Sequence, residues 1–149
     1  MSDQSLLYQQ TILDHNRNPK NFCKPAEYTH SAEGLNPLCG DHFEVFITIS
    51  SEEKIEEISF QGHGCAISKA SASIMTETLK GKHIEEAKKI FAEFKILLSD
   101  EQKNSDETKL GKLRIFSGVR KFPARVKCAN LAWYAMSAAL QDEKSASTE

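Results

Sequence analysis

Several features that define common classes of protein are missing from this sequence. No apolar run approaches the ~18 residues that a membrane-spanning helix needs. Lysine and arginine total 19 against 21 aspartates and glutamates, so the formal charge is −2, without the positive excess typical of nucleic-acid-binding domains. The first five residues have neither the basic start nor the apolar core of a secretory signal. We therefore expect a cytoplasmic protein that binds neither a membrane nor a nucleic acid.

Cysteine is also scarce, and its spacing is unusual for a metal protein. The four cysteines are Cys23, Cys39, Cys65 and Cys128, and none belongs to a C-x-x-C pair, the pattern that makes most zinc sites recognisable. Thiols stay reduced in the cytoplasm, which favours metal ligands or reactive groups over disulfides. The alternative is that Cys65 and Cys128 are small core residues, as free cysteines often are.

What the sequence does contain is the pattern of one α+β domain over residues 1–149. Its 40% apolar fraction is enough to form a hydrophobic core. Apolar residues alternate from Phe43 to Ile49, which predicts a strand, and Ile58 and Phe60 fit the return strand of a hairpin. Helices are expected at about 6–15, 66–79, 84–98 and 124–140, and irregular segments at 20–38 and 99–109. We predict a small antiparallel sheet of about three strands, packed against several helices, with a flexible polar tail at 142–149.

Three cysteines and one aspartate lie at positions that suit a metal site. If the chain before the first strand is extended, Cys39 and Asp41 point the same way. Cys65 is expected at a helix start, where free N–H groups favour a thiolate, and Cys128 on the inward face of the last helix. Three thiolates and a carboxylate are a tetrahedral set that suits zinc. The long separations along the chain do not by themselves predict that these residues meet.

Other polar residues near these cysteines have two readings each. Arg120, Lys121, Arg125 and Lys127 form a local basic cluster, which is either solvated charge or a docking site, with Arg125 and Lys127 as the docking candidates. His42 and His63 either enter a metal shell or form hydrogen bonds around it. Cys23 is read as a core or incidental thiol.

Three segments of the sequence resemble the cysteine motifs of the NifU N-terminal/IscU superfamily. They are Asn36-Pro37-Leu38-Cys39-Gly40-Asp41, Gly62-His63-Gly64-Cys65-Ala66-Ile67-Ser68 and Arg125-Val126-Lys127-Cys128-Ala129-Asn130-Leu131-Ala132. The opening segment 8–21 is also similar to that family, and the match covers roughly residues 5–141. Within the superfamily, the chain is most similar to the SufU-type branch, because Lys127 stands where IscU-type scaffolds have histidine and because residues 99–109 resemble the SufU insertion.

The resemblance implies a SufE/NifU-like fold and a zinc-dependent sulfurtransferase that acts in iron–sulfur cluster assembly. It assigns zinc to Cys39, Asp41, Cys65 and Cys128, and makes Cys39 the acceptor of persulfide sulfur. The donor would be a PLP-containing, SufS-like cysteine desulfurase, and the sulfur would pass to a downstream iron–sulfur scaffold. PLP would belong to the partner, so the chain is not expected to be a stand-alone enzyme.

Two other functions use the same residues. The first is an IscU-like scaffold that assembles a 2Fe–2S cluster, or binds iron, on the three cysteines, because thiolates bind zinc and iron–sulfur clusters alike. The second is a structural zinc module that binds partners without transferring sulfur. Metal content and the response of a desulfurase distinguish these functions.

Overall fold

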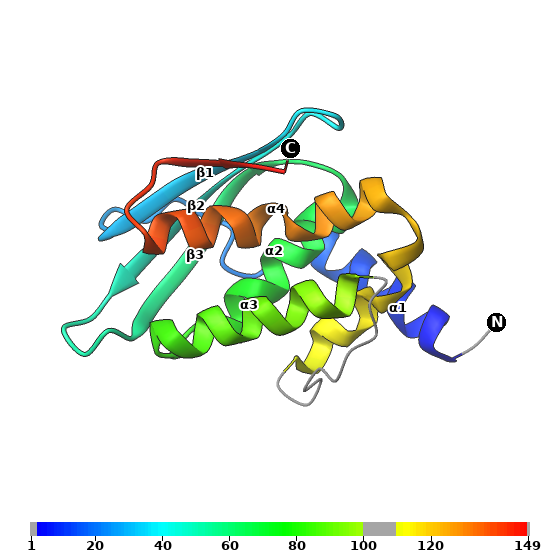
Figure 1. The fold of residues 1–149 in the computed structure, drawn as a ribbon, viewed down its shortest axis with the longest axis horizontal. Coiled ribbons are helices and arrows are strands. Elements are labelled where there is room, and N and C mark those ends of the chain that lie inside the picture. The colour runs from blue at the N-terminus through cyan, green and yellow to red at the C-terminus, as the bar shows by residue number, and fades with distance from the viewer. Residues whose placement is uncertain (1–2, 100–109, 149) are drawn as a thin grey trace.

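The computed structural model describes residues 3–99 and 110–148, which form a four-stranded sheet and a set of helices (Figure 1). The strands are β1 (His30–Asn36), β2 (Asp41–Ile49), β3 (Ile55–His63) and β4 (Ser145–Ser147). The α-helices are α1 (Asp3–Arg17), α2 (Ala66–Leu79), α3 (Ile84–Leu98) and α4 (Pro123–Leu140), and a 3₁₀-helix, η2, spans Gly111–Lys121. The predicted α+β class and all four predicted α-helices are confirmed. Most of the predicted loop at 99–109 lies outside the described residues.

The sheet is built on the predicted hairpin and extended by two strands. The strand order is β3-β2-β1-β4, with β2 antiparallel to both β1 and β3 and β4 parallel to β1. In the hairpin, Val45 pairs with Phe60 and Ile47 with Ile58. All four of these side chains are buried, as the alternating pattern predicted.

The prediction of an irregular segment over 20–38 is wrong for its second half, which forms β1. This strand escapes recognition because its inward residues are small: Ala32 and Gly34 are buried beneath α4. A Cβ atom at Gly34 would lie 3.1 Å from the carbonyl oxygen of Leu131 and 3.2 Å from the Cβ of Ala135. Close approach of a helix, rather than apolar bulk, therefore defines the inner face of β1.

Part of the predicted polar tail at 142–149 forms a short strand. Residues Ser145–Ser147 form β4 at the edge of the sheet, so the sheet has four strands rather than about three. Backbone hydrogen bonds hold both ends of this strand, from Glu33 N–H to the Lys144 carbonyl (2.9 Å) and from Thr148 N–H to the Leu35 carbonyl (3.1 Å). The polar composition of the tail fits this position, because an edge strand buries little side-chain surface.

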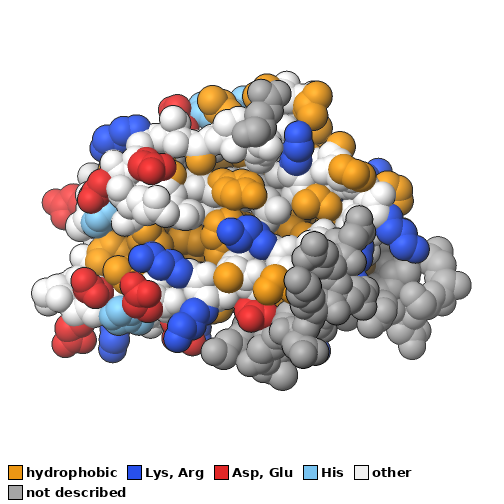
Figure 2. All heavy atoms as spheres, in the orientation of Figure 1, with side chains coloured by type: hydrophobic (Ala, Val, Ile, Leu, Met, Phe, Trp, Pro, Cys, Tyr) orange, Lys and Arg blue, Asp and Glu red, His pale blue; other side chains and the backbone are white. Residues whose placement is uncertain are grey.

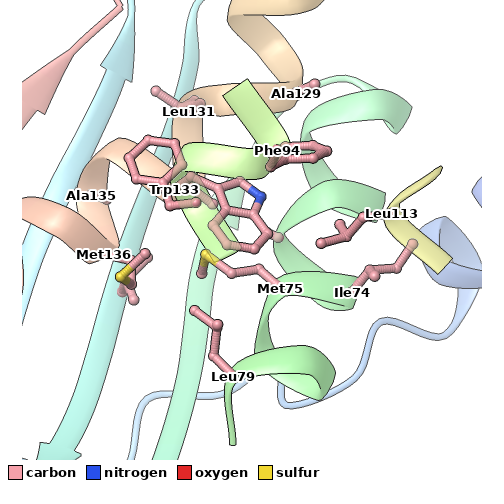
Figure 3. Close-up of a cluster of buried hydrophobic side chains, with 14 of the residues drawn as sticks. Ile74, Met75, Leu79, Phe94, Leu113, Ala129, Leu131, Trp133, Ala135 and Met136 are labelled. Carbon is pink, nitrogen blue, oxygen red and sulfur yellow. The ribbon is translucent and has the colours of Figure 1, made fainter. Parts of the chain in front are cut away.

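The core lies between the sheet and the helices, with Trp133 of α4 near its centre (Figure 3). The Trp133 ring stacks on Phe91 at 5.7 Å between centroids and packs against Phe94 at 5.0 Å. Its indole N–H donates to the hydroxyl of Ser71 at 3.2 Å, so the buried nitrogen is satisfied. Buried Leu113, Phe116 and Val119 recur every three residues along η2, the period of a 3₁₀-helix. This packing fixes α4, which carries Cys128, against the sheet.

The surface matches the near-neutral composition. On the face shown in Figure 2, acidic and basic side chains are interspersed around the end of the molecule that carries the β2–β3 hairpin. None of the helices within residues 3–99 and 110–148 is both long and apolar enough to cross a membrane.

Candidate metal centre

Three residues from distant parts of the chain meet at one end of α4. They are Cys39 in the turn before β2, Asp41 at the start of β2, and Cys128 in α4. One ligand atom from each lies within 4.8 Å of the other two. The Cys39 and Cys128 sulfurs are 3.8 Å apart. Tertiary structure thus brings together three of the four predicted ligands.

The route by which Cys39 and Asp41 meet differs from the predicted one. Residues 37–40 form a turn rather than an extended approach, with backbone N–H groups of Cys39 and Gly40 both donating to the Asn36 carbonyl. Gly40 has φ +71°, a left-handed conformation that glycine adopts without strain. The turn, and not the alternation of a strand, places the Cys39 thiol beside the Asp41 carboxylate.

Cys65 lies where the sequence predicted, as the N-cap of α2. Its sulfur accepts a hydrogen bond from the Ser68 backbone N–H at 3.4 Å, and its own N–H donates to Asp41 Oδ1 at 3.1 Å. The sulfur falls outside the group whose ligand atoms all lie within 4.8 Å of one another. Cys65 therefore borders the three-residue cluster and is tied to it through Asp41.

Ser68 is a residue of the site that sequence reasoning did not single out. Its side chain is buried, and its hydroxyl donates to Asp41 Oδ2 at 2.6 Å. The Ser68 hydroxyl oxygen also lies 3.2 Å from the Cys65 sulfur. The usable signal is its position three residues after the N-cap, where a side chain faces back towards the cap. Ser68 and the Cys65 N–H together occupy both carboxylate oxygens of Asp41 and fix its orientation.

A second unrecognised residue, Asn36, supports Cys128. The Asn36 amide donates to the Cys128 sulfur at 3.6 Å, and its carbonyl oxygen accepts a hydrogen bond from the Thr148 hydroxyl at 3.1 Å. Asn36 is buried at the end of β1, so the edge pairing that holds the tail also places a donor beside a candidate ligand. No local pattern around Asn36 points to this contact.

The pKa values of the Cys65 and Cys128 thiols are shifted in opposite directions. Interaction with the Cys128 thiol, which outweighs the opposing effect of burial, lowers the pKa of Cys65 to about 6, and hydrogen bonds from Ser68 act in the same direction. The same interaction, reinforced by burial, raises the pKa of Cys128. Of the two thiols, Cys65 is therefore the one that loses its proton more readily.

The cluster is buried on one side and open on the other. Cys128 and Asp41 are 4% and 3% exposed, whereas Cys39 and Cys65 are exposed. Two large apolar side chains are also exposed: Leu38, which directly precedes Cys39, and Phe122, which directly precedes α4. A partner can therefore reach Cys39 and Cys65 from solvent, while Asp41 and Cys128 stay held by the core.

The other residues that the sequence singled out are two basic side chains, two histidines and the fourth cysteine. Arg125 is exposed in the first turn of α4, 5.4 Å above the Phe122 ring, and Lys127 is half-buried one residue before Cys128. His42 and His63 lie on the strands that carry Asp41 and lead to Cys65, but neither belongs to the cysteine cluster. Cys23 is exposed and is not a core residue.

The residues present fit a metal ion. Two sulfurs and a carboxylate oxygen converge, and the Cys65 sulfur borders them, which gives the donor types of a tetrahedral zinc site. Both Asp41 oxygens and the Cys128 sulfur already have hydrogen-bond donors, the support that metal ligands usually have. Cys39, Asp41, Cys65 and Cys128 are the residues that would hold the ion.

Fold and site together define an α+β protein with a group of cysteines and an aspartate, able to bind a metal, near the N-terminal ends of α2 and α4. A model of the NifU-like N terminal domain family matches residues 7–129. The chain belongs to this family.

Relatives with similar sequence identity to this chain are named either sulfurtransferases or scaffold proteins. The zinc-dependent sulfurtransferase SufU of Bacillus subtilis is 37% identical over 138 residues, which are 93% of this chain and 92% of that protein. The iron–sulfur cluster assembly scaffold protein IscU of Streptococcus pyogenes is 36% identical, over 91% of this chain and 83% of that protein. A solved structure from Fervidobacterium islandicum, described as a cluster assembly scaffold of the SUF system, matches with TM-score 0.83 and 33% identity over 91% of this chain and 97% of that one.

Proposed function

We propose that this protein is a zinc-dependent sulfurtransferase that accepts persulfide sulfur from a cysteine desulfurase during iron–sulfur cluster assembly. The observation that carries the proposal is the exposed Cys39 thiol, 3.8 Å from buried Cys128 and grouped with Asp41. The similarity to a relative named a zinc-dependent sulfurtransferase supports it. Zinc, held by Cys39, Asp41, Cys65 and Cys128, would keep thiols deprotonated and order the loops that carry them.

The transfer itself is a thiol–persulfide exchange. The Cys39 thiolate attacks the outer sulfur of a cysteine persulfide on the partner, so a sulfur–sulfur bond forms on Cys39 while the partner's sulfur–sulfur bond breaks. The electron pair of the broken bond leaves on the partner's cysteine as a thiolate. Cys39 is left as a persulfide, whose sulfur would pass to a downstream iron–sulfur scaffold in the cytoplasm.

The partner consistent with this chemistry is a PLP-containing, SufS-like cysteine desulfurase. Arg125 and Lys127 precede Cys128 in α4, so they would meet an acidic surface on that partner as it reaches Cys39. The apolar side chains of Leu38 and Phe122 would be covered in the same complex.

The alternative, a scaffold that assembles a 2Fe–2S cluster, is favoured by the similarity to proteins named scaffolds. Metal analysis of the purified protein separates the two functions, because a zinc protein is colourless and a cluster protein is brown. One zinc per chain supports the transferase, and iron with acid-labile sulfide supports the scaffold.

The decisive experiment measures desulfurase turnover with and without this protein. We expect stimulation by the wild type and none by Cys39→Ala, because that variant lacks the accepting sulfur. Cys23→Ala is the matched control, since it removes another exposed thiol outside the cluster. Mass spectrometry of the desulfurase reaction should find the added sulfur on the peptide with Cys39. Full stimulation by Cys39→Ala would reject the assignment.

A further inference from the structure

A second group of metal-binding side chains lies on the face of the sheet opposite the cysteines. Successive residues of a strand point to opposite faces, so Asp41 points inward and is buried while His42 points outward and is partly exposed. His42 pairs directly with His63 across β2 and β3. His63 is exposed at the end of β3. The two imidazoles are therefore neighbours that the cysteine cluster does not use.

The two rings lie near enough for side-chain rotation to bring them onto one ion, although the ligand atoms of His42, His63 and Glu33 do not all lie within 4.8 Å of one another as they stand. Their centroids are 6.1 Å apart. Zinc binds imidazole nitrogens at about 2.1 Å, and two rings on one tetrahedral ion then have centres about 5 Å apart. Small side-chain rotations close this difference, and both side chains have solvent on one side.

A carboxylate completes the group. Glu33 of β1 reaches His42 diagonally across the sheet, with its Oε1 3.7 Å from His42 Nε2. That nitrogen is covered and has no hydrogen-bond partner among the described residues. Two ligands of one tetrahedral ion at ~2.0–2.1 Å are about 3.3 Å apart, so the nitrogen and the oxygen are spaced almost as ligands of a common ion. An ion between them would satisfy a nitrogen that the protein leaves unpaired.

We propose that His42, His63 and Glu33 form a second binding site, for a divalent transition-metal ion, on the outer face of the sheet. Two imidazoles and one carboxylate are borderline ligands that suit Zn²⁺, Ni²⁺, Co²⁺ and Fe²⁺ rather than Ca²⁺ or Mg²⁺. A bound ion ties β1, β2 and β3 together at the end where β2 begins with Asp41 and β3 leads into Cys65. The site does not depend on the function proposed for the cysteines.

The test adds Ni²⁺ to full-length protein that has first taken up one equivalent of zinc. We expect one Ni²⁺ per chain by calorimetry, and paramagnetic broadening of the ring proton signals of His42 and His63 but not of buried His15. His42→Asn and His63→Asn should each weaken Ni²⁺ binding at least tenfold, and Glu33→Gln by a smaller factor. Zinc content should stay the same in all three variants.

The matched control is His83→Asn. His83 Nε2 also lies 3.7 Å from a carboxylate, on Glu53, but within the part of the chain that the structure describes no ring contact joins His83 to a second histidine, as one joins His42 to His63. Asparagine also preserves the N-cap of α3, so the fold is not disturbed. Unchanged Ni²⁺ affinity in His83→Asn together with the losses above supports the site. Absence of Ni²⁺ binding to the wild type, or equal affinity in His42→Asn and His83→Asn, overturns it.

Discussion

At the level of single residues, Ser68 links two of the four candidate ligands. Its hydroxyl donates to the Asp41 carboxylate at 2.6 Å and lies 3.2 Å from the Cys65 sulfur, in a buried position. It does not belong to the ligand set, so it acts by orienting Asp41. A carboxylate oxygen that loses its donor in a buried site is left unsatisfied, which costs roughly 1–3 kcal/mol.

Ser68→Ala should therefore weaken zinc binding by roughly 10-fold or more, the loss typical of outer-sphere partners of metal ligands. Competition with a chelator of known affinity measures the change. Ser68→Thr, which keeps the hydroxyl, should recover part of the affinity.

The matched control for this prediction is Ser71→Ala. Ser71 is buried in the same helix, and its hydroxyl donates an equally short hydrogen bond to the Ala129 carbonyl at 2.6 Å, which the alanine variant loses. It should lower stability and leave zinc affinity unchanged. An equal loss of zinc affinity in both variants would mean that Ser68 acts only on the fold.

At the level of elements, the first turn of α4 carries the charge that would face a desulfurase under the proposed function. Arg125 is exposed there and held over the ring of Phe122, so its guanidinium has a defined position at low entropic cost. A second cation–aromatic pair lies in α3, where the Lys95 Nζ is 4.6 Å from the centre of the Phe91 ring.

Arg125→Glu should weaken the complex with the desulfurase by roughly 10-fold, because a rim charge that is reversed repels the acidic surface that it once attracted. The dissociation constant, measured at low and at moderate salt, should also become less sensitive to salt. Lys95→Glu makes the same charge change and should have no effect. Unchanged binding by Arg125→Glu would assign this charge to the solvated surface.

The elements themselves divide into those with strong local signals and those without. α2 and α3 were predicted with their observed bounds. For α2 the signal is a run of small residues without proline or glycine after a glycine-flanked turn, and for α3 it is apolar residues at helical spacing. β1 and β4 were missed, because their inward residues are small or few and their pairing is decided by contacts with α4 and with each other. β-structure of this kind depends on neighbours that local sequence does not specify.

At the level of the whole molecule, His15 joins α1 to α2 through a buried contact. Its Nδ1 lies 2.7 Å from the Ser73 hydroxyl and its Nε2 3.5 Å from Glu77 Oε1. Burial lowers the pKa of His15 from its ordinary value of 6.5, although Glu77 opposes the shift. Folded protein therefore takes up this proton at lower pH than unfolded protein does.

The sign of the effect on stability follows from that difference. Above pH 6.5 the imidazole is neutral in both states, and the stability is fully present. As the pH falls below 6.5 the unfolded chain binds the proton first, so the free energy of unfolding decreases until the folded state is protonated too. Acid should therefore loosen the contact between α1 and α2.

His15→Gln should remove this part of the pH dependence. Urea denaturation at several pH values below 7 gives the slope of the free energy of unfolding against pH for each protein. The difference between the two slopes is the contribution of His15, because contributions from the cysteines cancel. The variant should also lose about 1 kcal/mol at pH 7, because the contact with Ser73 is altered. Equal slopes below pH 6.5 in the two proteins would contradict the prediction.

The sequence by itself determined which residues are chemically able to form the centre. The three cysteine motifs, Asp41, and the helix start at Cys65 can all be read locally, because they depend on residue type and on short-range backbone preferences. The resemblance to the NifU N-terminal/IscU superfamily uses the same segments, and the family match confirms it.

Only the tertiary structure decided how those residues meet and which others serve them. Cys39 and Cys128 come to 3.8 Å because α4 packs on small residues of β1 and because a glycine turn redirects the chain before β2. Ser68 and Asn36 became visible only as hydrogen-bond donors to Asp41 and Cys128. Local sequence encodes donors and conformational preferences, whereas distances between remote side chains follow from how whole elements pack, and packing depends on the entire chain.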